Sequence, residues 1–253
     1  VFKFKLEDLS LVAGLQSWLK ADSGLLMDAQ QHISKWTDMS GNNHHAVQST
    51  PALKPAKQIG INELPSVSLD GVDDELFIPD TFEVGQVFSV FNWNGANLLP
   101  DYNGLLTAVD GNDVFFIGTT ATTSLYSAGF FATNVFVNEV QTLDLAPLNT
   151  YKIINGYTAT APFVYSGIRI GRDRSNPDRF WNGNISEVLV FDTVLSSDKS
   201  KLVYDYLSYK YAPPVNLGAN LTVCSFPFTL HAQKNYFKSY TWQDTTSADS
   251  IVI

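Results

Sequence analysis

Short strand-like runs separated by turn residues recur along most of this chain, and they restrict the folds open to it. The runs are rich in β-branched and aromatic residues, and glycine, asparagine, aspartate and proline stand between them. Helical periodicity is nearly absent across the same region. The pattern predicts an all-β sandwich or jelly roll. The predicted strands are residues 87–91, 105–109, 114–117, 134–140, 151–157, 168–170 and 185–191.

One segment near the end of the chain has the pattern of a helix. Residues 196–198 provide serine and aspartate for a cap and an acidic first turn. The apolar residues that follow at helical spacing are Leu202, Val203, Tyr206 and Leu207. A proline pair at 213–214 ends the segment, so we expect one C-terminal helix over residues 198–211. A second helical turn is expected at residues 12–20.

Composition and charge exclude several classes of protein. Hydrophobic residues make up 45% of the chain and charged residues 16%, so the chain can bury a core and is not globally disordered. The net charge of −9 and the pI near 4.7 argue against nucleic acid and against an anionic membrane surface, because both attract basic patches. No apolar run approaches the roughly 18–20 residues of a membrane span, so no membrane insertion is expected. Cys224 is the only cysteine, which permits no disulfide within the chain.

The proline pair at 213–214 is also the best candidate for a domain boundary. It divides the chain into a domain over residues 1–213 and a module over residues 214–253, and the module is too short to fold as an independent domain. Its predicted strands are residues 221–224, 228–231 and 239–242. The chain starts at Val1 without an initiator methionine and stops abruptly after Ile253, so we expect both ends to be cuts from a longer polypeptide.

Four sequence blocks, in a fixed order, carry a family resemblance. The first two are Gly-Leu-Gln-Ser-Trp-Leu-Lys-Ala-Asp-Ser-Gly at 14–24 and Ile-Ser-Lys-Trp-Thr-Asp-Met-Ser-Gly-Asn at 33–42. The other two are Leu-Asp-Gly-Val-Asp-Asp at 69–74 and the stretch 181–211, which starts with Trp-Asn-Gly-Asn-Ile-Ser-Glu-Val. Together they resemble the bacterial concanavalin A-like, laminin-G-like domains. The resemblance implies a concanavalin A-like jelly-roll β-sandwich with one C-terminal helix.

The tail carries a second resemblance. Leu-Gly-Ala-Asn-Leu-Thr-Val-Cys at 217–224 and Tyr-Thr-Trp at 240–242 resemble the immunoglobulin- or PKD-like repeats of Bacteroidetes surface proteins, although Gln243 stands where the repeat has glycine. This implies a partial Ig-like β-sandwich module, a repeat type in which a second cysteine often lies further along the chain than Cys224; here it would fall beyond Ile253. It also implies a secreted protein, extracellular or at the cell surface, similar to gliding-motility adhesins and other type IX secretion cargo. Secretion-system components would then be among its partners.

The sharpest candidate for a metal site is the acidic segment that begins at Asp70. Four carboxylates lie within six residues, and Gly71 permits a tight turn among them. Calcium takes six to eight oxygen ligands, often carboxylates on one loop, and relatives of the laminin-G family often hold it at a sandwich rim. The candidate Ca²⁺ ligands are Asp70, Asp73, Asp74 and Glu75. The alternative is a strand end that runs into a solvated acidic turn.

Glu187 is an acid inside a predicted strand, where it shares one face with Ile185 and Leu189 by the period of two. Retaining glycosidases of this architecture need two carboxylates about 5 Å apart, usually two or four residues apart on one strand. No acid stands at those positions here. We therefore interpret Glu187 as a buried structural acid, bound to backbone amides or to an arginine such as Arg169 or Arg172. The chain is predicted not to be an enzyme.

Two loops have the composition of a carbohydrate site, in which aromatic platforms are flanked by asparagine, aspartate and arginine. One is residues 93–103. The other is residues 171–180, in a region where four arginines lie within eleven residues of an otherwise acidic chain. The candidate ligand-binding residues are Trp93, Asn94, Tyr102, Asn103, Arg172, Arg174 and Asn176. The tryptophans of the family blocks, Trp18, Trp36 and Trp181, are expected in the core.

These features predict a non-catalytic adhesion or recognition segment of a large secreted cell-surface protein. We expect it to be stabilised by calcium and to bind a glycan, with a surface polysaccharide or glycoprotein as its partner. Two other hypotheses stay open. One is a purely structural spacer in a giant adhesin. The other is an accessory carbohydrate-binding domain of an extracellular glycoside hydrolase.

Overall fold

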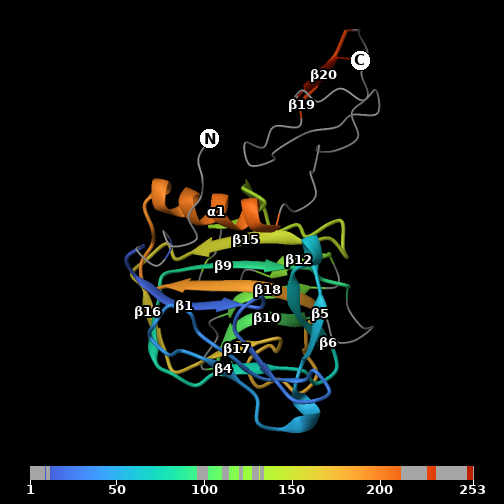
Figure 1. Cartoon of the computed structure of the whole chain (residues 1–253). Helices are drawn as coiled ribbons and strands as arrows, with labels where there is room; N and C mark the ends of the chain where they lie inside the picture. The colour runs from blue at the N-terminus through green and yellow to red at the C-terminus, as the bar shows by residue number, and fades with distance from the viewer. Residues whose placement is uncertain are drawn as a thin grey trace.

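Two β-sheets packed face to face form the body of the protein, and one helix covers the outer face of one sheet (Figure 1). The computed structural model describes Leu9 and residues 12–95, 102–109, 114–119, 122–126, 131, 134–211, 227–231 and 250–252. The predicted all-β sandwich with a single C-terminal helix is confirmed. In the described part of the chain, no helix combines the length and the apolar character that crossing a membrane requires.

The first sheet has eight strands, in the order β14-β13-β15-β9-β18-β6-β5, and β1 also pairs with β18. Its strands are β1 (Leu15–Lys20), β5 (Ala56–Ile59), β6 (Pro65–Asp70), β9 (Gln86–Phe91), β13 (Val135–Val137), β14 (Val140–Gln141), β15 (Lys152–Tyr157) and β18 (Asn182–Phe191). The long strand β18 is at its centre, because it pairs with β9 on one side and with β6 and β1 on the other.

The second sheet also has eight strands, in the order β12-β11-β10-β17-β7-β4-β3-β2. Its strands are β2 (Leu25–Met27), β3 (Ile33–Trp36), β4 (Ala46–Val47), β7 (Leu76–Ile78), β10 (Tyr102–Ala108), β11 (Val114–Thr119), β12 (Ser124–Tyr126) and β17 (Ile168–Ile170). Two small ribbons pair β8 (Phe82–Val84) with β16 (Phe163–Tyr165) and β19 (Thr229–His231) with β20 (Ser250–Val252). Short 3₁₀ turns lie at Pro51–Leu53 and Ile61–Glu63.

Two hydrophobic clusters hold these layers together. The larger cluster lies between the sheets and contains Trp36 and Trp181, and both are 0% exposed. The smaller cluster lies between the first sheet and the helix α1 (Ser197–Tyr211) and contains Trp18, which is 5% exposed. The three tryptophans of the family blocks therefore lie in the core, as predicted.

The helix α1 begins and ends close to its predicted bounds. The Ser196 hydroxyl accepts a hydrogen bond from the Lys199 amide at 3.4 Å, which caps the first turn. The buried residues of α1 are Val203, Tyr204, Tyr206, Leu207, Ser208 and Tyr211. Because they recur every three or four residues, they form one stripe that faces the first sheet.

The predicted helical turn at residues 12–20 is wrong, because residues 15–20 form β1 and pair with β18. Trp18 packs in the cluster under α1, whereas Leu19 packs in the cluster between the sheets. Both faces of this strand are buried, so its sequence lacks the alternation that marks a strand with one solvated face.

Residues 134–140 were predicted as one strand, but they contain a tight hairpin between β13 and β14. The two residues of its turn, Asn138 and Glu139, have positive φ angles of 49° and 66°. Two successive positive φ angles are the geometry of the turn that suits the twist of a two-residue hairpin.

The predicted common face of Ile185, Glu187 and Leu189 is wrong for Ile185, whereas Glu187 and Leu189 both face α1. The pairing of β18 with β9 shifts register between Ile185 and Glu187, which is the sign of a β-bulge. Ile185 therefore points between the sheets, while Leu189 points toward α1.

Several predictions lie outside the described residues. They are the domain boundary at 213–214, the environment of Cys224, and the strands at 221–224 and 239–242. Residues 229–231 and 250–252 form a two-stranded ribbon, which within the described residues pairs with neither large sheet.

Candidate functional site

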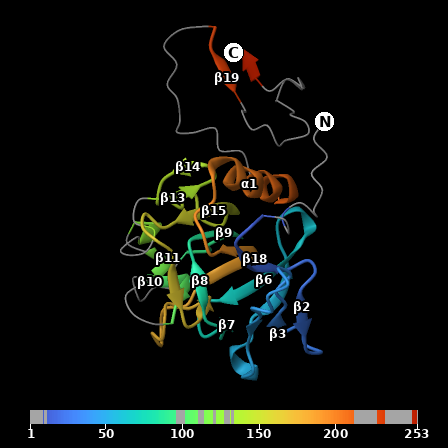
Figure 2. The ribbon, with the colours of Figure 1, turned by 90° about the vertical axis from the view of Figure 1, so that its left-hand side faces the viewer.

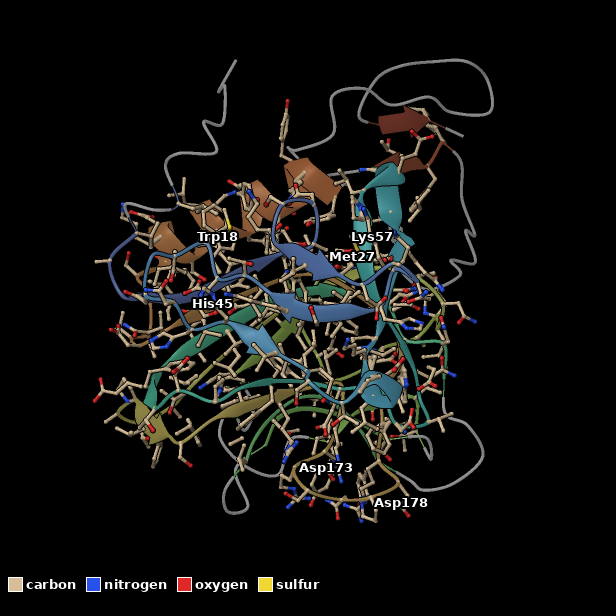
Figure 3. The ribbon with its side chains drawn as sticks, turned by 60° about the horizontal axis from the view of Figure 1, so that its bottom comes forward. Trp18, Met27, His45, Lys57, Asp173 and Asp178 are labelled. Atoms are coloured by element: carbon tan, nitrogen blue, oxygen red, sulfur yellow. The ribbon has the colours of Figure 1, made fainter. Side chains whose placement is uncertain are left out.

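The loop from Gly171 to Trp181 crosses the outer face of the second sheet, on the side of the sandwich opposite α1 (Figure 3). Gly104 of β10 permits this close approach, because a Cβ atom there would overlap the backbone of Arg172 and Asp173. Asn103 donates a side-chain hydrogen bond to the Phe180 carbonyl at 2.8 Å. The loop is thus held against the sheet by its own backbone and by β10.

Asp173 fixes this loop from inside. Its carboxylate is fully buried and accepts hydrogen bonds from Arg174 Nε at 2.7 Å and from Arg179 Nη1 at 2.9 Å. Asn176 Nδ2 donates to the same carboxylate at 3.1 Å. A buried carboxylate is stable when charged partners and hydrogen bonds surround it, so one side chain sets the position of two guanidinium groups.

The two guanidinium groups lie beside two tyrosines. Arg179 stacks over the ring of Tyr102 with its Cζ atom 4.9 Å from the ring centroid. Tyr126 meets Tyr102 edge to face at a centroid distance of 5.2 Å. We call Tyr102, Tyr126, Arg174 and Arg179 the shelf. Tyr126 is 43% exposed, and the two arginine side chains are 26% and 28% exposed, so the shelf is open to solvent.

Strand register explains why the two tyrosines share the outer face. Gly118 faces Trp93 and Trp181 inside the sandwich, so Ile117 and Thr119 of the same strand point outward. Tyr126 is paired with Ile117, and Tyr102 is paired with Thr119. Because paired residues project from the same face of a sheet, both tyrosines point outward as well.

Of the predicted ligand-binding residues, the structure brings Tyr102 and Arg174 together in the shelf. Arg172 and Asn176 lie beneath it and support the loop: Arg172 donates to the Asn176 carbonyl at 2.8 Å and to Glu75 at 3.0 Å. Asn103 is buried and also supports the loop.

The prediction for Trp93 as an exposed platform is wrong, because Trp93 is 2% exposed and stacks on Trp181 at 5.1 Å. Asn94 lies elsewhere, on the rim where its amide donates to Asn182 at 3.3 Å, and Asn182 is paired with Asp70. The prediction missed Tyr126. Its signal is the alternation Ser124-Leu125-Tyr126, in which Leu125 is buried and Tyr126 is not.

Three of the four predicted metal ligands converge at the end of β6. Each of Asp70, Asp73 and Asp74 offers one carboxylate oxygen, and these oxygens lie within 4.8 Å of one another. We call these three residues the acidic turn. Burial, together with the charges of Asp70 and Asp73, raises the pKa of Asp74 to about 7. A divalent cation would relieve this repulsion, so the donor set suits calcium.

Glu75 does not belong to the acidic turn, which corrects the predicted ligand set. Its carboxylate points the other way and forms ion pairs with Arg169 and Arg172. Adjacent residues of an extended segment project to opposite sides, so Asp74 and Glu75 cannot both face the same ion.

The raised pKa of Asp74 predicts that stability falls as pH rises, with calcium removed by a chelator. The folded state holds the Asp74 proton to about pH 7, whereas the unfolded chain releases it near pH 4. The folded state therefore binds more protons across this window, and we expect a loss of about 1–2 kcal/mol between pH 4 and 8, because solvent screens part of the interaction. Urea unfolding of the wild type, Asp74→Asn and Asp178→Asn, an exposed control, measures the free energy of unfolding across this pH range. Its decrease with pH should be smaller in Asp74→Asn than in the wild type and should be unchanged in Asp178→Asn. An equal decrease in all three proteins would contradict the prediction.

Glu187, the acid inside β18, is fully buried and makes four polar contacts. Trp18 Nε1 and Lys210 Nζ donate to it at 2.6 Å each, and the hydroxyls of Tyr206 and Tyr211 donate at 2.9 and 2.7 Å. The prediction of a buried structural acid is confirmed.

The predicted arginine partners of Glu187 are wrong, because Arg169 and Arg172 pair with Glu75 on the second sheet. Burial and the Glu187 carboxylate raise the pKa of both the Tyr206 and Tyr211 hydroxyls, so both remain protonated donors. Glu187 therefore joins α1 to the first sheet.

No family model matches this chain, and no curated protein matches its sequence. Among solved structures, it is similar to Trypanosoma rangeli sialidase in complex with 2,3-difluoro-KDN, with 13% identity and a TM-score of 0.42 over 79% of this chain and 33% of that one. The chain thus spans about a third of the length of that sialidase.

Two further solved structures are similar to it. Domain 4 of AbnA, a GH43 extracellular arabinanase from Geobacillus stearothermophilus in complex with arabinotriose, has 13% identity and a TM-score of 0.44 over 74% of this chain and 97% of that one. A GH54 α-L-arabinofuranosidase soaked with a cyclic sulfate inhibitor has 12% identity and a TM-score of 0.41, with coverage of 95% and 69%.

Proposed function

We propose that this chain is a non-catalytic glycan-recognition segment of a secreted cell-surface protein, and that the shelf is its binding surface. The observation that carries the proposal is the arrangement of Arg179, Tyr102 and Tyr126 on an exposed sheet face. Tyrosine rings offer a flat apolar surface to the C–H face of a sugar, and guanidinium groups donate to its hydroxyls. Because Asp173 already fixes the guanidinium groups, binding costs little side-chain entropy.

The remaining parts of the proposal rest on the sequence blocks. The laminin-G-like resemblance supports a recognition module, and the resemblance of the tail supports an Ig-like repeat and export through a type IX pathway. A surface polysaccharide or glycoprotein is the proposed partner, and secretion-system components are proposed as further partners. An accessory domain of a glycoside hydrolase would use the same shelf.

Replacing Tyr126 by alanine is expected to weaken glycan binding about five- to thirtyfold, because the edge of the aromatic platform and about 1–2 kcal/mol of stacking are lost. A glycan array identifies a binding glycan for the wild-type chain, and titration calorimetry then measures the variants. Tyr209→Ala is the matched control, since Tyr209 is a similarly exposed tyrosine, at 48%, but lies on α1. A glycan that binds both variants equally contradicts the shelf, and a wholly negative array favours the structural spacer.

We further propose that calcium binds the acidic turn. Calcium at about a hundred times its Kd should stabilise the fold by about 2.7 kcal/mol, because it binds the folded chain and not the unfolded one. The melting temperature at pH 7.5, with calcium and then with EDTA, measures the effect. The gain should vanish in Asp74→Asn and persist in Asp178→Asn. An unchanged wild-type melting temperature would contradict the proposal.

A further inference from the structure

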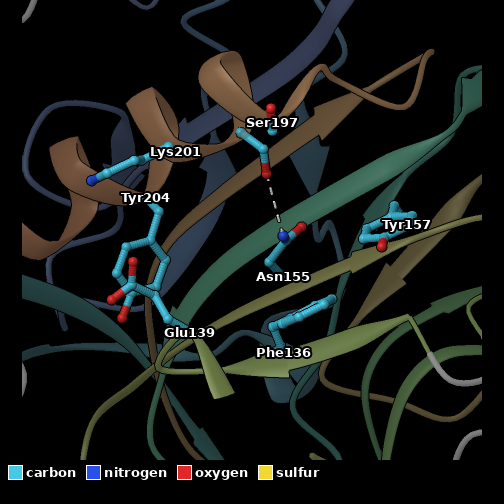
Figure 4. Close-up of a pocket in the computed structure, with 8 residues that line it drawn as sticks. Phe136, Glu139, Asn155, Tyr157, Ser197, Lys201 and Tyr204 are labelled. Carbon is cyan, nitrogen blue, oxygen red and sulfur yellow. Dashed lines mark hydrogen bonds between the residues drawn. The ribbon is translucent and has the colours of Figure 1, made fainter. Parts of the chain in front are cut away.

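A pocket of about 280 Å³ lies between the first turns of α1 and the edge of the first sheet (Figure 4). Figure 2 shows β13 and β14 beside α1 at this edge. The alternation of β15 explains how the sheet contributes to it. Ile154 points into the core between the sheets, so Asn155 and Tyr157, one and three residues further along the strand, both project from its other face, toward α1. Phe136 is paired with Asn155 and shares that face.

Two aromatic rings form one wall of the pocket. Phe136 and Tyr157 lie nearly parallel, with ring centroids 6.0 Å apart and planes inclined by 16°. Both are half-buried, so their rings are reachable from the pocket. An aligned aromatic pair of this kind presents a flat apolar surface to a ligand.

The floor of the pocket is polar and is fixed by Gln86, which is 1% exposed. Gln86 Nε2 donates to Asn155 Oδ1 at 2.8 Å and to Ser200 Oγ at 3.0 Å, and Asn155 Nδ2 donates to Ser200 Oγ at 3.4 Å. The Gln86 oxygen accepts from the Leu195 amide at 2.8 Å, which sets the orientation of the whole group.

This network leaves donors for a ligand. A hydroxyl has one hydrogen and two lone pairs, and Ser200 Oγ already accepts two hydrogen bonds. The Ser200 hydrogen and the second Asn155 amide hydrogen have no acceptor among the interactions of the described residues. Both lie at the floor of the pocket, and a ligand with oxygen acceptors would satisfy them.

The charges around the pocket favour a neutral ligand. Lys201 lines the pocket, but its ammonium group is paired with Asp205 at 2.6 Å. Glu139, from the hairpin between β13 and β14, also lines the pocket and adds a negative charge. A phosphate or another anion would therefore meet little net positive charge here, whereas a hydroxyl group can donate to the carboxylate.

We propose that this pocket binds one neutral monosaccharide ring, at the end or at a branch of a glycan. The C–H face of the sugar would stack on Phe136 and Tyr157, and its hydroxyl oxygens would accept from Ser200 and Asn155. The volume of about 280 Å³ is just below the ~300–1,000 Å³ typical of pockets for drug-sized ligands, which suits one ring. The pocket lies on the opposite side of the sandwich from the shelf, so the inference stands apart from the proposed function and gives the chain two sugar sites.

Titration of the ¹⁵N-labelled full chain with methyl glycosides of glucose, galactose, mannose, xylose and N-acetylglucosamine tests the proposal. At least one of them should shift the amide signals of residues 136–139, 155–157 and 197–201. Ser200→Ala and Asn155→Ala should each weaken this binding about five- to tenfold, the effect of one hydrogen bond. Lys199→Ala, on the same helical turn but exposed, should leave it unchanged.

Three results would overturn the proposal. They are no shift with any glycoside, shifts that Ser200→Ala and Asn155→Ala leave unaltered in folded protein, and tighter binding of inorganic phosphate at the same residues. Tyr126→Ala separates the two sites. It should leave the pocket titration unchanged, just as Ser200→Ala should leave binding at the shelf unchanged.

Discussion

Replacing Glu187 by alanine is expected to lower the free energy of unfolding by about 3–5 kcal/mol, the cost of removing one partner from a buried ionic network. Lys210, whose side chain is 11% exposed, would keep Asp22 at 2.9 Å as its ion-pair partner and lose Glu187. The indole of Trp18 would lose its acceptor inside the cluster under α1, and the hydroxyl of Tyr211 would keep only the longer hydrogen bond to the Ser186 carbonyl at 3.3 Å. Buried donors without acceptors cost about 1–3 kcal/mol each. Urea unfolding at pH 7 measures the loss.

Two further variants make the result specific. Glu187→Gln keeps the shape and one acceptor oxygen but removes the charge, so its loss should be smaller than that of alanine. Glu83→Ala removes an exposed carboxylate from β8 and should change stability by less than about 0.5 kcal/mol. If Glu187→Ala were as stable as Glu83→Ala, Glu187 would not be what holds α1 to the first sheet.

The burial of Glu187 can be predicted from the residues of β18, but its partners cannot. An acid between Ile185 and Leu189 predicts burial, and the acid is buried. Its partners come from β1 and from α1, which are distant in the sequence. The bulge beside it turns Ile185 to the opposite face, and no residue in β18 signals that shift. Periodicity records local geometry, whereas the partners of a buried charge depend on tertiary packing.

The strands and the helix were largely predictable, for a physical reason. Turn residues separate the strands, and a cap followed by an apolar stripe defines α1. The prediction failed at β1, where Trp18 and Leu19 are buried on opposite faces and no alternation is visible. It failed again at residues 134–140, where Asn138 and Glu139 turn the chain without a glycine or a proline.

The candidate sites also differ in how far the sequence predicts them. The acidic turn was predictable because its three carboxylates are neighbours in sequence, and only the direction of Glu75 required the structure. The shelf was half predictable. Loop composition pointed to Tyr102 and Arg174, but strand register decided that Tyr126 joins them and that Trp93 does not. The pocket beside α1 had no local signal, because its floor combines residues of β9, β15 and α1.

Replacing Asp173 by alanine is expected to cost about 2–3 kcal/mol of stability and to abolish glycan binding at the shelf. Arg174 and Arg179 would lose a fully buried carboxylate. The expected loss is smaller than for Glu187, because both guanidinium groups are about a quarter exposed and water can solvate them. Without the carboxylate, the loop no longer fixes Arg179 over Tyr102, so the shelf loses its preorganised geometry. Urea unfolding and glycan titration measure the two effects.

Asp178→Ala is the matched control, because Asp178 lies on the same loop but is exposed (Figure 3). It should change the free energy of unfolding by less than about 0.5 kcal/mol and should leave the glycan affinity unchanged. The decisive comparison is within Asp173→Ala itself. If the variant loses stability yet binds glycan with wild-type affinity, Asp173 is a structural carboxylate and the glycan binds elsewhere on the sandwich. If both fall together while Asp178→Ala keeps both, the loop that completes the fold of the second sheet also sets the geometry of the shelf.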